Sequence, residues 1–291
     1  MKKTTLFYTV LLIGAFYTGC SKGGDPAPAP PTPPPTPPTP TQKTCIISGI
    51  SQRNSGSKAE FAIQMTYNAS LDPTSISVYD SAAGKSLFNA SLTYVTTDSI
   101  RIDQYQYIRL DASKRVSVLV TKSDMNDVAN ADNYRYEYVY NGEGYLATKN
   151  LFINGSKTPD YVTSYSYSNG LLTGCVMSVG GVPGQKLLES TLTYDASVSP
   201  KTMVYAFPDG FENYYYTAAL NFGSKPNKAL AQVVTKIYNT ANATLIDTWT
   251  TNYGSYTIDS NGYMTSCNAS GDQQQGIAGF YGKTYLSYQC Q

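Results

Sequence analysis

Residues 133–155 read NYRYEYVYNGEGYLATKNLFING, two alternating segments on either side of an Asn-Gly turn. Before the turn, tyrosines occupy every second position, which is the period of a β-strand. Asn and Gly tolerate the positive φ angles that a tight turn requires. The stretch therefore predicts a β-hairpin. The 27 tyrosines of the chain favour strands elsewhere too, because tyrosine fits a pleated, half-buried surface.

The same pattern recurs along the chain, as YVTSYSYSNGLLTGCVMSVGG at 161–181 and LLESTLTYDASVSPKTMVYAFPDG at 187–210. The tyrosine before the turn recurs after 27 residues from Tyr67 to Tyr94, and again from Tyr140 to Tyr167 and from Tyr167 to Tyr194. Neighbouring hairpins of such an array bury one another's apolar face. We therefore predict a mainly β fold, a single large curved antiparallel sheet of 27-residue hairpin units over residues 45–291. The tyrosines that mark the copies are Tyr67, Tyr94, Tyr140, Tyr167, Tyr194 and Tyr256.

The segments YVYNGEGYLATK (138–149), YSYSNGLLTG (165–174) and YTIDSNGYMTS (256–266) resemble degenerate YD repeats of the RHS type. With the N-terminal segment and LNFGSKPNKALAQVVTKIYN (220–239), they resemble a family of Bacteroidota lipoproteins with tyrosine-rich hairpin repeats. The resemblance implies an architecture and supplies no catalytic residue. Two departures, the missing pattern at 98–125 and the missing turn glycine in YDASVSP (194–200), favour a curved sheet over a closed RHS shell.

Residues 227–239 differ from their surroundings. Leu230, Val233, Val234 and Ile237 fall on one helical face, and Asn227 suits an N-cap, which predicts a short amphipathic helix packed on the sheet. The same residues include QVVTKIY, whose β-branched side chains also favour a strand.

The first 44 residues predict export and anchoring. Lys2 and Lys3 precede a short apolar segment, so residues 1–19 are expected to be a signal peptide. Tyr17-Thr18-Gly19-Cys20 resembles a bacterial lipobox, which implies acylation of Cys20 and attachment to the outer membrane. Residues 20–44 then form a Pro/Thr-rich linker that favours extended polyproline II. The sequence leaves open whether the protein faces the periplasm or the cell surface.

Charge and cysteines narrow the function classes. The 21 basic and 20 acidic side chains balance, which argues against a nucleic-acid partner. Apart from Cys20, an even number of cysteines remains, and two disulfides in an exported protein allow three connectivities. Cys45 opens the domain and Cys290 almost closes it, so we expect these two to pair. Cys175 and Cys267 would then form the second disulfide. The four are Cys45, Cys175, Cys267 and Cys290.

Catalytic constellations are not recognisable. The chain contains no histidine, which excludes histidine-based triads, dyads and zinc sites. It shows no phosphate-binding glycine motif, and we expect no metal and no cofactor. Asp209 and Glu212 in DGFE could face a cleft, although such a stretch more often forms a hairpin turn. We therefore expect a protein that is not an enzyme and keep a carboxylate-based enzyme as a remote alternative.

The tyrosine clusters suggest a binding surface. In one cluster, alternation places four tyrosines on one face of a strand, where they either stack against sugar rings or belong to the core. The favoured hypothesis is an envelope module that binds a glycan or a protein partner through this face. The alternative is a carrier of lipids or other amphiphiles, in which the sheet wraps a pocket beneath a helix. The candidate residues are Tyr134, Tyr136, Tyr138, Tyr140, Tyr214, Tyr215 and Tyr216.

Overall fold

The structure is a computed structural model that describes residues 44–53, 61–80, 83–122, 130–180, 182, 185–202, 214–272 and 282–291. Of Tyr214 and Tyr215 it describes the backbone alone. The predicted signal peptide, Cys20, the Pro/Thr-rich linker up to residue 43, and the DGFE stretch lie outside these residues, so those predictions stay predictions.

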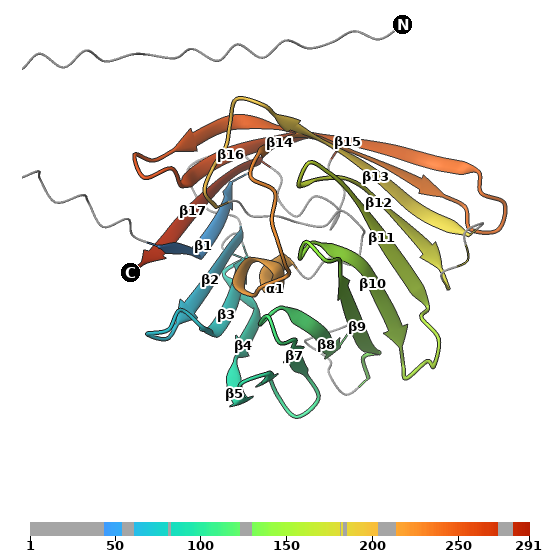
Figure 1. Cartoon of the computed structure of the whole chain (residues 1–291), viewed down its shortest axis with the longest axis horizontal. Coiled ribbons are helices and arrows are strands. Elements are labelled where there is room, and N and C mark those ends of the chain that lie inside the picture. Colours follow the sequence, from blue (N-terminus) through green and yellow to red (C-terminus); the bar gives the residue numbers. More distant parts are fainter. Residues whose placement is uncertain are drawn as a thin grey trace, which may run out of the picture. The chain divides into compact units, whose positions relative to one another are not determined.

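Strands dominate the described chain, as the tyrosine alternation predicts. They form one antiparallel sheet that curls into a nearly closed barrel (Figure 1). The strands are β1 (Cys45–Arg53), β2 (Phe61–Tyr67), β3 (Pro73–Asp80), β4 (Lys85–Ser91), β5 (Thr93–Thr96), β6 (Ser99–Arg101), β7 (Tyr107–Leu110), β8 (Val116–Lys122), β9 (Asn133–Tyr140), β10 (Leu146–Ile153), β11 (Tyr161–Ser168), β12 (Leu171–Val179), β13 (Lys186–Asp195), β14 (Ala229–Tyr238), β15 (Leu245–Ile258), β16 (Met264–Gly271) and β17 (Gly282–Cys290).

The strands follow one another around the barrel in chain order, and β17 returns to pair with β1 from Cys45↔Cys290 to Arg53↔Lys283. Leu92 alone separates β4 from β5; β4 pairs with β3, whereas β5 pairs with β6. The two therefore continue one another across Leu92, as two parts of one strand. Counted as one, they reduce the 17 strands to an even number, which an up-and-down antiparallel barrel needs in order to close.

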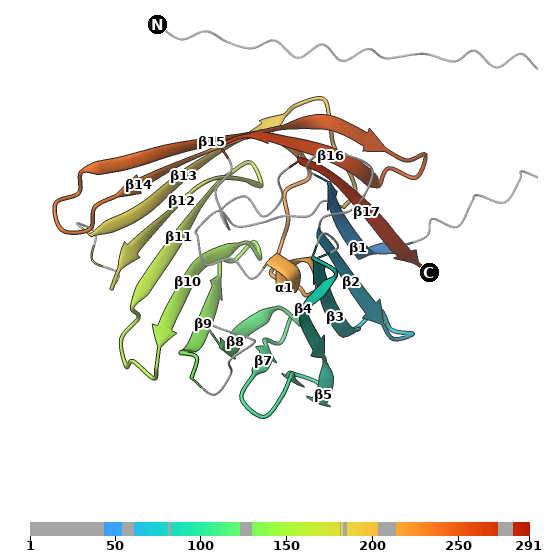
Figure 2. The same ribbon diagram turned by 180° about the vertical axis from the view of Figure 1, so that it is seen from behind.

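One short helix, α1 (Tyr214–Ala219), lies inside the ring of strands, as both views in Figures 1 and 2 show. Its Tyr216 is fully buried and meets Phe88 of β4 edge to face, with 5.9 Å between ring centres. Phe222, just after the helix, meets Tyr138 of β9 at 5.0 Å. Barrels of this strand number otherwise leave an open channel. Here, α1 and the residues after it fill part of the interior.

The helix predicted at 227–239 is wrong, because these residues form β14, the competing interpretation. β14 pairs along its length with β13 and with β15, so both of its edges are satisfied. Val233 and Thr235 point inward and are buried, while Lys236 points outward. Val233 and Val234 fit the i, i+3, i+4 spacing of a helix as well as a strand. Pairing of this segment with β13 and β15 makes it a strand.

The region 98–125 lacks the repeat pattern in sequence, and its described part, up to residue 122, continues the barrel as β6, β7 and β8. YDASVSP, which lacks the turn glycine, ends β13 and begins the long connection that carries α1. The missing glycine therefore marks the point at which the chain leaves the wall and enters the interior.

Candidate functional site

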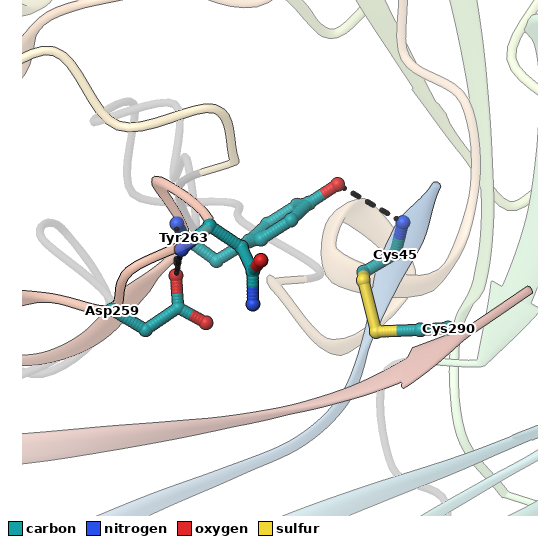
Figure 3. The surroundings of a disulfide bond; sticks show 5 residues. Cys45, Asp259, Tyr263 and Cys290 are labelled. Atoms are coloured by element: carbon teal, nitrogen blue, oxygen red, sulfur yellow. Dashed lines mark hydrogen bonds between the residues drawn. A yellow bond between two sulfur atoms is a disulfide. The ribbon is translucent and has the colours of Figure 1, made fainter. Parts of the chain in front are cut away.

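One end of the barrel concentrates the repeated features, and we call it the disulfide end. The turns at this end include 68–72, 111–115, 141–145 and 259–263. The first and last residues of the barrel, Thr44 and Gln291, lie at the same end. Thr44 and Gln291 bond there through their backbones in both directions, at 3.2 and 3.0 Å. The Cys45–Cys290 disulfide joins β1 to β17 beside them, as predicted (Figure 3).

The repeated tyrosine has a structural role at this end. Its hydroxyl donates a hydrogen bond to a backbone carbonyl near the start of the preceding strand, as Tyr140 does to Val116 at 2.7 Å and Tyr194 to Leu172 at 2.9 Å. Each hydroxyl thus ties its strand to the strand before it. We call the residues with this bond the corner tyrosines: Tyr67, Tyr140, Tyr194, Tyr256 and Tyr288.

An Asn or Asp residue organises the turn after four of the corner tyrosines. It follows Tyr67, Tyr140 and Tyr194 directly and lies three positions after Tyr256. Asp259 accepts hydrogen bonds from the N–H groups of Asn261 and Tyr263, at 2.9 and 2.8 Å (Figure 3). The bond from Tyr263 is the main reason why the pKa of Asp259 is lowered. The same pair of bonds, from the residues two and four positions on, occurs at Asn68, Asp111 and Asn141. These side chains are turn residues, which explains the scatter of the carboxylates in the sequence.

The four tyrosines predicted as a binding face line the inside of β9. Tyr136 and Tyr138 are 2% and 8% exposed, and Tyr136 stacks on Tyr138 with 6.4 Å between centres. Tyr134 and Tyr140 are partly buried against the same core, which Tyr216 also joins. An exposed aromatic face at these positions is therefore wrong. The alternation that gathers them on one face is confirmed, and that face belongs to the core, where Phe222 meets Tyr138.

Two cavities lie at the disulfide end, on either side of the end of α1. The larger, of about 700 Å³, lies against the turns of the hairpins β2–β3, β5–β6 and β7–β8. Its lining is Asn68, Leu71, Asp72, Pro73, Tyr94, Thr96, Thr97, Leu110, Lys114, Ala219, Leu220 and Asn221. The smaller, of about 410 Å³, shares Leu71, Ala219, Leu220 and Asn221 with it and extends to Cys45, Lys201 and Lys225. Shared residues make the two cavities neighbours.

The larger cavity is lined by both apolar and charged side chains. Leu71, Leu110 and Leu220 are apolar, whereas Asp72 and Lys114 carry charge. Burial, with Asp72 nearby, raises the pKa of Tyr94 to about 12, so its hydroxyl is a neutral donor and acceptor at this site. A lining with apolar walls and a few polar groups is typical of sites for small molecules.

The sequence did not reveal these lining residues, because they come together from the turns and the long connection. The one available signal was the missing turn glycine of YDASVSP, which opens the connection that carries Lys201, α1 and Lys225.

The predicted pairing of Cys175 with Cys267 is wrong, since both are thiols. Cys175 lies on β12 and Cys267 on β16, with β13, β14 and β15 between them in the wall. Burial raises the pKa of Cys267 to about 11, which keeps that thiol protonated near neutral pH.

The outer wall is largely polar. Side chains that point outward from the barrel include serines and threonines on successive strands, whereas most inward positions are apolar or aromatic. This is the reverse of transmembrane barrels, whose outer face is apolar and whose interior is polar. Outward examples are Gln64, Thr66, Ser164, Ser166, Thr191, Thr193, Thr248, Asn252 and Ser287. Separately, no helix among the described residues is long and apolar enough to cross a membrane.

The chain matches no protein family and no curated protein. Among solved structures it is similar to a porin-like protein from Bacteroides uniformis ATCC 8492, with a TM-score of 0.52 and 18% identity, covering 84% of this chain and 96% of that one. A porin-like protein from Bacteroides vulgatus ATCC 8482 has a TM-score of 0.51 and 11% identity, covering 84% and 99%. At these identities the likeness shows the fold. The class is thus an up-and-down antiparallel β-barrel, here with a helix inside.

Proposed function

We propose that the chain is an exported, lipid-anchored envelope protein whose barrel binds a small amphiphilic molecule beside α1, without catalysis. The signal-like segment and the lipobox-like residues that end at Cys20 support the anchor. The porin-like description of the two Bacteroides structures is consistent with an envelope location.

One observation carries the binding proposal, the cavity of about 700 Å³ with apolar residues and polar turn residues around it. Its volume lies within the range of ligand sites, roughly 300–1,000 Å³. An amphiphile fits a lining of this kind because its apolar part covers Leu71, Leu110 and Leu220 while its polar part meets the turns. A stacking platform for glycans has less support, since the four tyrosines of β9 and Tyr216 pack in or against the core.

The test compares a variant that fills the cavity with one that does not. Ala219 lines both cavities and is partly exposed, so Ala219→Phe adds bulk to the cavity space. Val139→Phe adds similar bulk on the outer wall, where Val139 is 50% exposed. We expect native mass spectrometry of the protein from its host to show a small molecule bound to the wild type and to Val139→Phe. Loss of that mass in Ala219→Phe supports the proposal, and its absence from all three overturns it.

The anchor is tested apart from the cavity. Cys20→Ser should abolish incorporation of labelled palmitate and release the protein from the membrane fraction. Unchanged labelling would show that Cys20 is not the acylated residue.

A further inference from the structure

The smaller cavity differs from the larger one in charge. Lys201 and Lys225 line it, and its described lining includes no carboxylate. Its other walls are largely apolar and include Ile47, Leu71 and Leu220. Two positive charges therefore face a space in which the described residues provide no opposite charge.

Lys201 is held in place by an aromatic ring. Its amine lies 5.4 Å from the centre of the Tyr263 ring, a distance at which a cation is attracted to the ring face. Lys201 also packs along Gly262, in the turn between β15 and β16. The amine is thus positioned at the cavity without an ion pair to a described residue.

The amine of Lys225 has no hydrogen bond or ion pair within the described chain. The side chain is exposed by surface area, yet protein atoms surround it so densely that desolvation lowers its pKa. Both facts hold for a side chain that stands in an open space within the end of the barrel.

Neighbouring lysines of this end do have partners. The amine of Lys228 donates to the carbonyl of Ala196 at 2.7 Å, and that of Lys114 donates to the carbonyl of Thr97. An ammonium group among apolar walls is unfavourable until an anion or an acceptor compensates for the lost water. The ammonium protons of Lys225 have no partner in the described chain, so a bound anion would add a charge-assisted hydrogen bond there.

We propose that the smaller cavity holds the acidic group, a carboxylate or a phosphate, of an amphiphile whose apolar part occupies the larger cavity. The inference rests on the proposed binding of an amphiphile. Leu71, Ala219, Leu220 and Asn221 line both cavities, so one molecule can extend across the end of α1 from one to the other. Asn221 and Thr202 add polar groups to the lining of the smaller cavity.

The test measures affinity by isothermal titration calorimetry of the full chain at pH 7 with decanoate, decyl phosphate and neutral 1-decanol. We expect the anionic probes to bind about tenfold or more tightly than decanol, the effect of one hydrogen bond to a charged group. Lys225→Gln should remove this preference and leave the affinity for decanol unchanged. Lys201→Gln should reduce it in part. Lys228→Gln, three residues away and bonded to Ala196, is the matched control and should bind as the wild type does.

The outcomes separate this inference from the binding proposal. Equal affinity for decanol and the anionic probes, unaffected by Lys225→Gln, overturns the anion site while the amphiphile cavity stands. Absence of binding of all three probes, together with no co-purified ligand, overturns both. Inorganic phosphate alone at Lys225, with affinity equal to that of decyl phosphate, overturns the assignment to a headgroup and identifies a site for free anions. Retained folding of Lys225→Gln is checked by circular dichroism, and Lys225→Arg should restore the preference.

Discussion

The hydroxyl group explains why the strand ends at the disulfide end carry tyrosine rather than phenylalanine. The ring of each corner tyrosine packs on the core, and the hydroxyl satisfies a carbonyl of the preceding strand. The residue before that carbonyl also meets the ring in two cases. Arg115 lies 4.3 Å from the Tyr140 ring centre, and the Tyr263 ring lies 5.1 Å from that of Tyr288. One residue type thus supplies apolar burial and a bond between strands.

Tyr140→Phe tests this role. It removes the 2.7 Å bond to Val116 and leaves a partly buried carbonyl without its donor, so the free energy of unfolding should fall by about 1–2 kcal/mol. Tyr79→Phe is the control, because Tyr79 is 44% exposed on the outer wall, and it should change stability by less than about 0.5 kcal/mol. Equal unfolding midpoints in urea for the two variants would contradict the role of the hydroxyl.

The segment after α1 is an element whose fit depends on one glycine. Gly223 has φ of +88°, and a Cβ atom there would contact the carbonyl oxygen of Gly144 and lie 2.9 Å from Cε1 of Tyr140. Ser224 completes the contact by donating its N–H to Gly144 at 2.9 Å. The segment is therefore held against the β9–β10 turn at a distance that excludes a side chain.

Gly223→Ala should destabilise the protein by about 1–3 kcal/mol and loosen α1, because the clash forces residues 221–224 away from the turn. Gly142→Ala, in the same β9–β10 turn, has no atom within 4 Å of the added Cβ and is the matched control. Hydrogen exchange should show faster exchange at the N–H of Leu220 and Ser224 in the first variant alone. Unchanged exchange there would mean that the glycine is not required.

At the scale of elements, the strands of the barrel wall could be predicted from the sequence better than the helix and the cavities inside the barrel. Alternation and turn residues predicted hairpins with tyrosines on one face, because these features depend on neighbours in the chain. β14 was predicted as a helix since its two valines fit both periods, and only pairing with β13 and β15 decides between them. The cavities could not be predicted, because they depend on where the connection after Asp195 runs inside the barrel.

For the whole molecule, the disulfide joins residues 245 positions apart and fixes the closure of the barrel. A cross-link over so long a loop stabilises by about 2–5 kcal/mol. Reductant should lower the urea midpoint of the wild type to that of Cys45→Ser/Cys290→Ser. The double variant itself should not respond to reductant, and an unaffected wild type would mean that the bond adds no stability.

Alkaline pH should destabilise the whole barrel. Burial raises the pKa of Tyr67, Tyr140, Tyr256 and Tyr288 well above the usual value of 10. The stability from keeping them protonated is complete below pH 10, where the unfolded state is protonated too. It is lost as the pH rises above 10, because the unfolded state then releases protons that the folded state retains.

The measurement is a pH titration of phenolate absorbance alongside circular dichroism. We expect these four tyrosines to ionise together with loss of the strand signal. Their ionisation one by one in a barrel that stays folded would show that their hydroxyls are accessible to solvent.

The adjacency of Thr44 and Gln291 has a consequence for how the fold is encoded. β17 pairs with β1 in the same way as any other two neighbouring strands pair. The order of the strands around the barrel is therefore cyclic, and the chain termini interrupt it between β17 and β1. A peptide link from Gln291 to Thr44, with new termini in the exposed turn between β14 and β15, would describe the same barrel in a different reading order. The fold thus specifies a cyclic sequence of hairpins, and the starting point of the gene is independent of it.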